Sequence, residues 1–499
     1  MEYFDDISLI VFTAAEIIIQ FVVVIHILLT KHEESASAIL WLLVVLFFPV
    51  FGVIMYLIFG INRVNTLGIS IKLANEQMNA QKNEPFRNKL AHYFEEQRKF
   101  IAKNDKTNWG TVSYNRTIDR LLPETLPLRG NNLELLKDGN MAYPRMIEAM
   151  EKARKNIHLQ SFIIMNDKIG TEIFDILERK AEQGIDVKVL YDRFGSGQAI
   201  ISHFFRKYSK RIPKLKILPF ARVNLFTPWR IQLRNHRKLL VVDGETAFIG
   251  GINISSENVA PSAALKDKYI HDLHCKVEGP SVGYLQFSFL RDWCYASATR
   301  PPSVFTQEHF PMPEDKGEAI VRVIDSGPGH NHEASEKIFF TATSTAKKYI
   351  WIMTPYFVPD ISFIKALCMT AARDVEVRLI VPKKNNHWYV QYAAQSLYQT
   401  LLSNGVRIFE KKGSFSHAKA MIVDGEWGFM GSSNCDVRSF RLNYELDFVV
   451  STGEFLGDLH AQFEEELSES EEVSLNRIYN KKLQLQLIEN LCSLLIPVL

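Results

Sequence analysis

The 499-residue sequence has few cysteines, no excess of charge of either sign and no evident set of metal ligands. Its five cysteines are widely spaced, odd in number and without a CxxC pair, which excludes a disulfide framework and a cysteine zinc site. Lys and Arg total 58 against 56 Asp and Glu, so the basic excess of a nucleic-acid-binding protein is missing. No cluster of Asp, Glu and His has metal-site spacing. We expect reduced, mostly buried thiols in a cytosol-facing domain, with no metal and no nucleic-acid partner.

Charged residues are also scarce in two runs near the N-terminus. Residues 7–30 are mostly apolar, with Glu16 as the one acidic residue among them, and residues 39–59 carry no charge. About 20 apolar residues suffice to cross the hydrocarbon core of a membrane. A signal peptide is the alternative for the first run, although its acidic leader lacks Lys and Arg, and a buried core helix is the alternative for the second. Because the two runs lie close together, we predict a transmembrane helical hairpin over residues 1–60, with spans at about 7–30 and 39–59.

The loop between the predicted spans, residues 31–38, is too short to hold a domain. Both ends of the hairpin are therefore expected on one side of the membrane, together with everything after residue 60. Lys and Arg near the spans are sparse, and they favour a cytoplasmic position for the rest of the chain.

A repeated motif, H-x-K-x4-D-x6-G, is the most informative feature that the sequence does contain. Its first copy begins at His236 and its second at His417, 181 residues later (417 − 236). Nine of the 18 positions in 236–253 and 417–434 are identical, and each copy ends on an asparagine, Asn253 or Asn434. A single H-x-K carries little information, but two full copies with matching flanks indicate a functional site with two-fold pseudo-symmetry.

The surrounding pattern predicts an α/β fold. Residues 61–130 are polar and are expected to form a helical or loose linker. Short apolar runs then alternate with helical stretches over 131–305 and again over 318–499, which predicts two pseudo-symmetric lobes of mixed sheets flanked by helices. The strands expected are 156–165, 186–191, 348–354 and 375–381, and the helices expected are 142–155, 171–183 and 361–372. An apolar helical stripe within 475–499 is expected to pack against the second lobe, with the membrane surface as the alternative.

The residue types of the motif suit phosphodiester chemistry. A histidine and a lysine two positions apart point to the same face of a strand, as His236 with Lys238 and His417 with Lys419 would. Neutral imidazole can attack phosphorus, and a second, protonated histidine can give the leaving group its proton. Fixed donors must hold the non-bridging oxygens. The donors expected are Lys238, Lys419, Asn253 and Asn434, and the small residues Gly251 and Ser432 are expected to bring the backbone close to the phosphate.

Two pairs of carboxylates accompany the histidines. Asp272 lies 36 residues after His236, and Glu445 lies 28 residues after His417. Each is expected to fix the tautomer and orientation of a histidine, by analogy with the aspartate of a hydrolase triad. The aspartates of the motif, Asp243 and Asp424, belong to Asp-Gly turns. As motif residues they are included in the predicted catalytic set, but their expected role is to accept hydrogen bonds from local backbone amides and so to brace a hairpin.

These residues resemble the phospholipase D superfamily, with both of its HKD motifs, and within it the bacterial cardiolipin synthases. The segments that carry the resemblance are 191–196, 234–238, 250–253, 354–360, 436–440 and 442–445, together with the apolar N-terminus. The resemblance implies two phospholipase D-like α/β lobes behind a membrane hairpin, in a multi-pass protein of the bacterial cell membrane. Departures such as Ile270-His271-Asp272, where Trp-Arg-Asp is common, leave the catalytic set intact.

The resemblance also implies an activity without a cofactor, in which two phosphatidylglycerol molecules give cardiolipin and glycerol. His236 would form a phosphohistidine, and His417 would act as acid and then as base. Water as the acceptor, giving phosphatidic acid, is the alternative; a nuclease or a non-catalytic lipid-binding protein fits the sequence less well. The resemblance does not identify the acceptor lipid. It is compatible with an oligomer but does not fix the oligomeric state.

Overall fold

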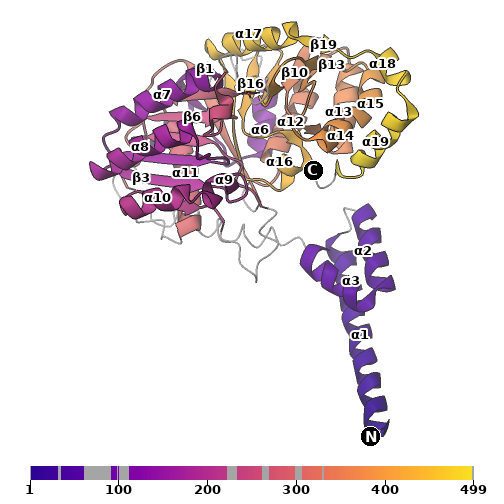
Figure 1. Ribbon diagram of the computed structural model, residues 1–499. Helices are drawn as coiled ribbons and strands as arrows, with labels where there is room; N and C mark the ends of the chain where they lie inside the picture. Colours follow the sequence, from indigo (N-terminus) through magenta and orange to yellow (C-terminus); the bar gives the residue numbers. More distant parts are fainter. Residues whose placement is uncertain are drawn as a thin grey trace. The chain divides into compact units, whose positions relative to one another are not determined.

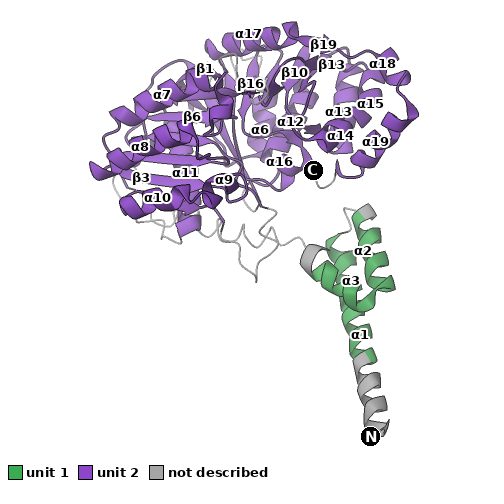
Figure 2. Cartoon of the chain, viewed as in Figure 1, with its two compact units in different colours: residues 1–67, 223–232 green, residues 68–222, 233–499 purple. Residues whose placement is uncertain are grey.

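The computed structural model of the chain describes residues 2–31, 35–60, 92–97, 99–100, 112–221, 233–260, 269–297, 306–328 and 331–496. It contains two compact units (Figure 2). The first comprises residues 1–67 with 223–232, and the second comprises 68–222 with 233–499.

The first unit is a small helical assembly. Its elements are α1 (Glu2–Thr30), α2 (Ser35–Phe47), α3 (Pro49–Met55) and the π-helical turn η1 (Tyr56–Gly60). Among the described residues, α1 alone is long and apolar enough to cross a membrane, with a mean hydropathy of 2.1 over Thr13–Thr30. This agrees with the first predicted span and fits a membrane protein.

The second apolar run differs from the single straight span predicted over 39–59. The helix ends at Phe47, and Phe48, with φ −129° and ψ 74°, turns the chain before Pro49 starts α3. The chain then folds back along α2, so that the Tyr56 ring lies 5.4 Å from that of Trp41. A Cβ on Gly52 would overlap the backbone of Val44, so this close approach requires a glycine.

The returning segment ends beside the C-terminal end of α1. The hydroxyl of Tyr56 lies 2.7 Å from Nδ1 of His26, and Gln20 Nε2 donates to the carbonyl of Val45 (2.8 Å). The second apolar run thus first runs alongside α1 and then returns to the level of the last turns of α1.

The second unit is built on one continuous sheet of 15 strands, with helices on both faces (Figure 1). The strands of the first lobe are β1 (Leu128–Lys137), β2 (Asn156–Ser161), β3 (Asp186–Tyr191), β4 (Lys216–Pro219), β5 (Leu239–Val242), β6 (Thr246–Gly250) and β8 (Leu273–Glu278). Those of the second are β9 (Ala319–Ser326), β10 (Tyr349–Met353), β12 (Glu376–Pro382), β13 (Arg407–Lys411), β15 (Ala420–Val423), β16 (Trp427–Gly431), β18 (Glu445–Ser451) and β19 (Ser470–Glu472).

The strand order confirms the duplication. From the junction outwards, the first lobe runs β1-β8-β6-β5-β2-β3-β4 and the second runs β9-β18-β16-β15-β10-β12-β13, with β19 added at the edge. Equivalent pairs also share direction: β2 and β3 are parallel, as are β10 and β12, whereas β5 and β15 run antiparallel to their neighbours β2 and β10. The lobes join where β1 pairs antiparallel with β9. Mixed α/β lobes were predicted; their fusion into one sheet was not.

Helices cover the sheet in matching positions. The first lobe has α7 (Asp138–Lys152), α8 (Lys168–Glu182), α9 (Gly197–Ile201), α10 (Phe204–Arg211) and α11 (Val282–Ser297). The second has α12 (Ala334–Thr345), α13 (Ile361–Ala371), α14 (Trp388–Ser396), α15 (Tyr398–Ser403), α16 (Val437–Arg441), α17 (Phe455–Ser468), α18 (Leu475–Tyr479) and α19 (Leu483–Ser493). One core on the α11 and α17 face contains residues of both lobes, while the opposite face has a separate core in each. The shared core makes the two lobes a single rigid frame for whatever lies between them.

Two segments outside the lobes have unexpected positions. Helix α6 (Val112–Leu121), within the predicted linker, packs on the second lobe, where Tyr114 stacks on Trp427 with ring centroids 4.8 Å apart. The C-terminal stripe does not pack inward as expected. Helix α19 meets α14 through its side with Cys492, whereas Leu483 and Leu491 are more than two-thirds exposed.

Candidate active site

The two motifs meet at the junction between the lobes. The backbone N–H of His236 donates to the carbonyl of Tyr444 (2.9 Å), and that of His417 donates to the carbonyl of His271 (2.7 Å). Short parallel pairings support both contacts, Asn235 with Tyr444 and β14 (Phe415–Ser416) with β7 (Ile270–His271). Each histidine is therefore delivered by a segment that is paired with the opposite lobe.

Each histidine is held by a carboxylate of the other lobe. Nδ1 of His236 lies 2.9 Å from Oε2 of Glu445, and Nδ1 of His417 lies 2.7 Å from Oδ2 of Asp272. The carboxylates were predicted correctly as partners, but a pairing of each with the histidine of its own repeat is wrong. Each carboxylate directly follows the residue whose carbonyl accepts the N–H of the other lobe's histidine: Asp272 follows His271, and Glu445 follows Tyr444. In both pairs Nδ1 is the bonded atom, which leaves Nε2 as the ring nitrogen for a substrate.

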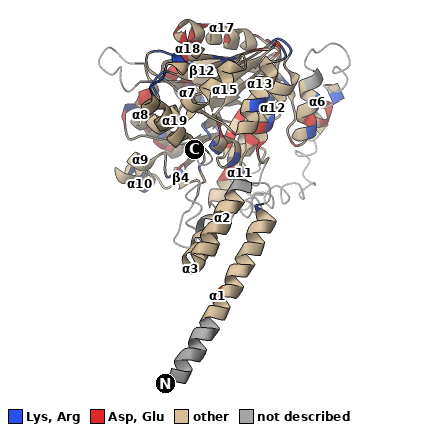
Figure 3. Ribbon diagram, turned by 90° about the vertical axis from the view of Figure 1, so that its right-hand side faces the viewer, with Lys and Arg blue, Asp and Glu red and all other residues tan. Residues whose placement is uncertain are grey.

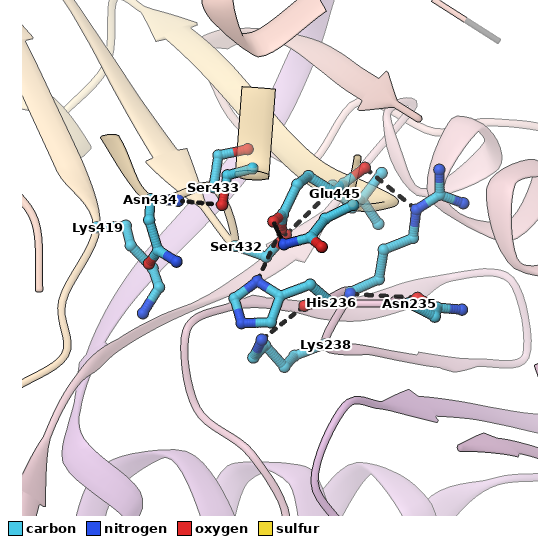
Figure 4. A network of polar contacts seen from close by, with 12 residues as sticks. Asn235, His236, Lys238, Lys419, Ser432, Ser433, Asn434 and Glu445 are labelled. Carbon is cyan, nitrogen blue, oxygen red and sulfur yellow. Dashed lines mark hydrogen bonds and ion pairs between the residues drawn. The ribbon is translucent and has the colours of Figure 1, made fainter. Parts of the chain in front are cut away.

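The two lysines lie in the same buried cluster. Lys238 Nζ donates to the carbonyl of His236 (2.6 Å), and Lys419 Nζ lies 2.7 Å from Nδ1 of His417. Figure 4 shows Lys238 and His236 of the first lobe beside Lys419, Asn434 and Glu445 of the second. Burial, together with the charge of Lys419, lowers the pKa of Lys238 to about 7. Burial likewise lowers the pKa of Lys419 to about 8. Two crowded ammonium groups form a ready site for a phosphate anion.

The imidazoles are neutral in the free protein at neutral pH. Burial lowers the pKa of His236 well below its ordinary value, and the charges of Lys238 and Lys419 act in the same direction. Burial and the charge of Lys419 lower the pKa of His417 to about 3. Both lysines act on both rings, which places the two histidines in one electrostatic environment. A neutral imidazole is the form that can attack phosphorus.

The two orienting carboxylates differ in charge. Burial opposes ionisation of Asp272, but the charge of Lys419 and the contact with His417 outweigh it and lower its pKa. Burial raises the pKa of Glu445 to about 7, although Lys238 acts against this shift. At neutral pH His417 thus faces a full negative charge, whereas His236 faces a carboxyl group that is partly protonated. An ionised partner stabilises an imidazolium, so His417 is better placed to carry a proton.

The remaining motif positions support these pairs. The N–H of Ile163 donates to Oδ1 of Asn253 (3.0 Å), which orients the amide so that its NH2 group is the end available to an anion. A Cβ on Gly251 would overlap the carboxylate of Asp272, and Ser432 Oγ donates to Oε2 of Glu445 (2.5 Å). The contacts shown for Gly251 and Ser432 are therefore with the orienting carboxylates; binding of substrate by the two positions, and by Asn253 and Asn434, stays a prediction.

The aspartates of the motif lie outside the cluster. Asp243 and Asp424 occupy hairpin turns with φ of 55° and 56°, as the Asp-Gly dipeptides predicted. Each accepts three backbone N–H groups at 2.7 to 2.9 Å, from residues 154–156 and 347–349 respectively. The predicted bracing is confirmed, but it fastens the start of the neighbouring strand rather than the turn itself.

Two aromatic residues at the site were not among the site residues predicted from the sequence. The ring of Phe162 lies 5.0 Å from that of His236, and the ring of Tyr356 lies 6.0 Å from that of His417. Each comes shortly after an equivalent strand, β2 or β10. The signal that could have identified them is this shared position at the carboxyl end of a predicted parallel strand.

A second polar cluster lies elsewhere in the first lobe. His158, Asp186 and His309 bring ligand atoms within 4.8 Å of one another, a grouping that sequence spacing did not reveal. The ammonium of Lys188 forms an ion pair with Asp186 and lies 3.4 Å from Nε2 of His158. Lys188 thus already supplies the positive charge at this cluster. We therefore interpret the cluster as a structural ion pair.

The duplicated sheet and the two crossed histidine–carboxylate pairs define a phospholipase D-like protein. The family model described as "Cardiolipin synthase, PLD-like domain" matches residues 146–279 and 340–467, and one described as "Phospholipase_D-nuclease N-terminal" matches 18–60. The chain belongs to the cardiolipin synthase family of phospholipase D-like proteins, and it is an enzyme of the phosphatidyltransferase class.

Named relatives extend over nearly the whole chain. A cardiolipin synthase of Halalkalibacterium halodurans is 33% identical over 475 residues, 94% of this chain and 90% of the relative. The probable cardiolipin synthase YwiE of Bacillus subtilis is 32% identical over 471 residues, 92% and 87% of the two chains. The crystal structure of a phosphatidylserine synthase of Haemophilus influenzae shares the fold, with a TM-score of 0.59 at 16% identity over 77% of this chain and all of that one.

Proposed function

We propose that the protein transfers a phosphatidyl group from one phosphatidylglycerol to another, forming cardiolipin and releasing glycerol. The observation that carries this proposal is the crossed pair of contacts, His236 with Glu445 and His417 with Asp272, which gives one buried site two oriented imidazoles. The printed names of the relatives support the choice of lipid.

The first half of the reaction forms a covalent intermediate. Nε2 of His236 attacks phosphorus, the bond from phosphorus to the glycerol oxygen breaks, and His417 gives its proton to that oxygen. The phosphodiester anion, once bound, favours the protonated form of His417 that this step needs. The ionised Asp272 supports the assignment, because it stabilises a cationic ring at His417.

The second half transfers the phosphatidyl group. The terminal hydroxyl of a second phosphatidylglycerol gives its proton to His417 and attacks phosphorus, and the bond from phosphorus to nitrogen breaks. Burial of both histidines and both lysines supports transfer over hydrolysis, because a site that holds little water disfavours water as the acceptor. Hydrolysis to phosphatidic acid is the alternative outcome.

The test uses the purified full chain with labelled phosphatidylglycerol, followed by separation of the lipids. The wild type is expected to form cardiolipin and glycerol in equal amounts, also in the presence of chelators. His236→Ala and His417→Ala are each expected to reduce product at least about a thousandfold. His332→Ala, at a half-exposed position, serves as the control and is expected to match the wild type. Phosphatidic acid as the main product would establish the hydrolase instead, and activity in the double histidine variant would refute the mechanism.

The bend in the first unit supports a particular membrane topology. We propose that α1 crosses the bacterial cell membrane once, and that the segment from α2 to η1 re-enters and returns to the side of Thr30. Tyr56 beside His26 supports this path, because the chain then leaves at the end of α1 that is far from Glu2. It places Lys31 on the side of the membrane opposite to Glu2, which agrees with a cytoplasmic catalytic unit. The predicted hairpin would instead have put both ends on one side.

A further inference from the structure

A chain of alternating charges runs across the junction directly behind Asp272. The buried ring of His271 lies between two carboxylates: Nδ1 is 2.7 Å from Oδ1 of Asp138, and Nε2 forms an ion pair at 2.7 Å with Oε1 of Glu466. Lys411 continues the chain, with Nζ at 2.7 Å from Glu466 and 2.6 Å from Glu469. Asp138 belongs to the first lobe, and Glu466 lies on α17 of the second.

The surroundings of His271 require the charged form of its ring. A carboxylate faces each nitrogen, so both nitrogens must carry a proton to avoid facing an anion with a lone pair. Among the residues that the structure describes, the other charged or titratable groups nearby reach the ring through these carboxylates or through the backbone. Tyr269 contacts Asp138, Lys411 contacts Glu466, and Asp272 and His417 lie along the paired strands. Burial opposes the charged ring, but Asp138 and Glu466 outweigh it and raise the pKa of His271 to about 9.

The same contacts reach the catalytic pair through the backbone. Oδ1 of Asp138 accepts the N–H of Asp272 (3.0 Å) as well as the proton of His271, and the N–H of Asp138 donates to the carbonyl of Asp272 (2.9 Å). The carbonyl of His271 accepts the N–H of His417. Through these contacts the imidazolium connects the segment that carries Asp272 in the first lobe, the segment that carries His417 in the second lobe, and helix α17.

The opposite half of the site is supported differently. Tyr444 takes the place of His271 there, because its carbonyl accepts the N–H of His236 and it precedes Glu445. The guanidinium of Arg237 lies 5.6 Å from the Tyr444 ring and bonds Asp292 (2.6 Å) and Asp325. A guanidinium stays charged at every accessible pH, whereas an imidazolium does not. The pseudo-symmetry is thus broken in the groups that stabilise the two halves.

We propose that His271 is a positioning residue: its buried imidazolium clamps Asp138 to Glu466 across the lobes and thereby holds Asp272 in place against His417. The effect on turnover rests on the proposed function, but the clamp itself does not. When the ring loses its proton, one carboxylate loses its partner, the segment carrying Asp272 loosens, and the His417 half of the site fails before the His236 half.

The experiment compares His271→Arg, which keeps a charge, and His271→Gln, which does not, with the wild type. The control is His309→Gln, which removes another buried histidine beside a carboxylate, Asp186, away from the site. Hydrogen exchange of the full chain measures protection of the amides of Asp272 and His417 without any need for turnover. Formation of cardiolipin from labelled phosphatidylglycerol is followed from pH 7 to 10, and the ratio of variant to wild-type rate cancels the titration of Lys238 and Lys419.

Expected results follow from the charge. In His271→Gln the two amides exchange at least about tenfold faster, and turnover falls about tenfold to a hundredfold at pH 7, as for a small misplacement of a catalytic group. The ratio of His271→Arg to wild-type rate rises as the pH passes through about 9, while His309→Gln changes neither the exchange at these amides nor the pH profile. Unchanged exchange in His271→Gln would overturn the clamp. If exchange changes in His271→Gln but the wild-type protein forms no cardiolipin, only the proposed function is refuted. If the ratio of the His271→Arg rate to the wild-type rate does not change with pH, the role of the proton on His271 is refuted.

Discussion

Nδ1 of His417 lies 2.7 Å from Oδ2 of Asp272, a carboxylate that the other lobe supplies. The equivalent contact, His236 with Glu445 at 2.9 Å, crosses the junction in the opposite direction. Neither lobe therefore contains both a motif histidine and the carboxylate that orients it. The continuous sheet and the core shared by both lobes are what hold the site together.

The unequal charges of the two carboxylates predict unequal effects of neutralising them. Asp272→Asn replaces an ionised partner of His417 and is expected to lower kcat about a thousandfold or more, because the amide cannot stabilise the imidazolium. Glu445→Gln is the matched variant on the other side. It is expected to cost less at pH 6, where the carboxyl group is largely protonated, and more at pH 8, because the pKa of Glu445 is about 7. Equal losses at both pH values would contradict this difference.

The lysines predict how substrate binding depends on pH. Lys238 and Lys419 have pKa values of about 7 and about 8, both below the ordinary value for lysine, so each loses its charge as the pH rises through that value. Affinity for the phosphate anion should fall in the same range, and KM should rise severalfold between pH 7 and 9. Ionisation of Glu445 in this range acts on His236 and therefore on kcat, which separates the two effects. A KM that stays constant over this interval would show that the lysines keep their charge.

Glycine at position 251 is predicted to be essential for the placement of Asp272. In Gly251→Ala the new methyl group would overlap the carboxylate, so Asp272 must move away from His417, with an expected loss of at least about a hundredfold in turnover. Gly283→Ala is the matched control, because a Cβ there meets nothing within 4 Å and the residue lies in α11. It is expected to keep full activity and to gain about 0.5–1 kcal/mol of stability. A Gly251→Ala enzyme with normal turnover would show that this close contact has no catalytic importance.

The features that could be predicted from the sequence are those encoded locally. The strands at 186–191 and 375–381 and the two Asp-Gly hairpins follow from short-range pattern, and the structure has β3, β12 and both turns there. The crossed pairing of His236 with Glu445 depends instead on how two lobes meet, which spacing along the chain does not encode. The bend at Phe48 was marked by Pro49 and Gly52, but hydropathy alone favoured a straight span over them.

That bend predicts which side of the membrane each end of α1 occupies. A protease-cleavable tag placed before Glu2 is expected to be cut from outside in intact spheroplasts, whereas a tag after Leu499 is expected to be cut only when the membrane is permeabilised. The reason is the contact of Tyr56 with His26, which returns the second apolar run to the level of the last turns of α1. A two-span hairpin would leave both tags on the same side. To separate the alternatives further, Gly52→Leu removes the close approach to Val44 that the re-entrant path needs. If the path is re-entrant, this variant should insert poorly or expose both tags on one side, and unchanged cleavage of both tags would contradict the bend.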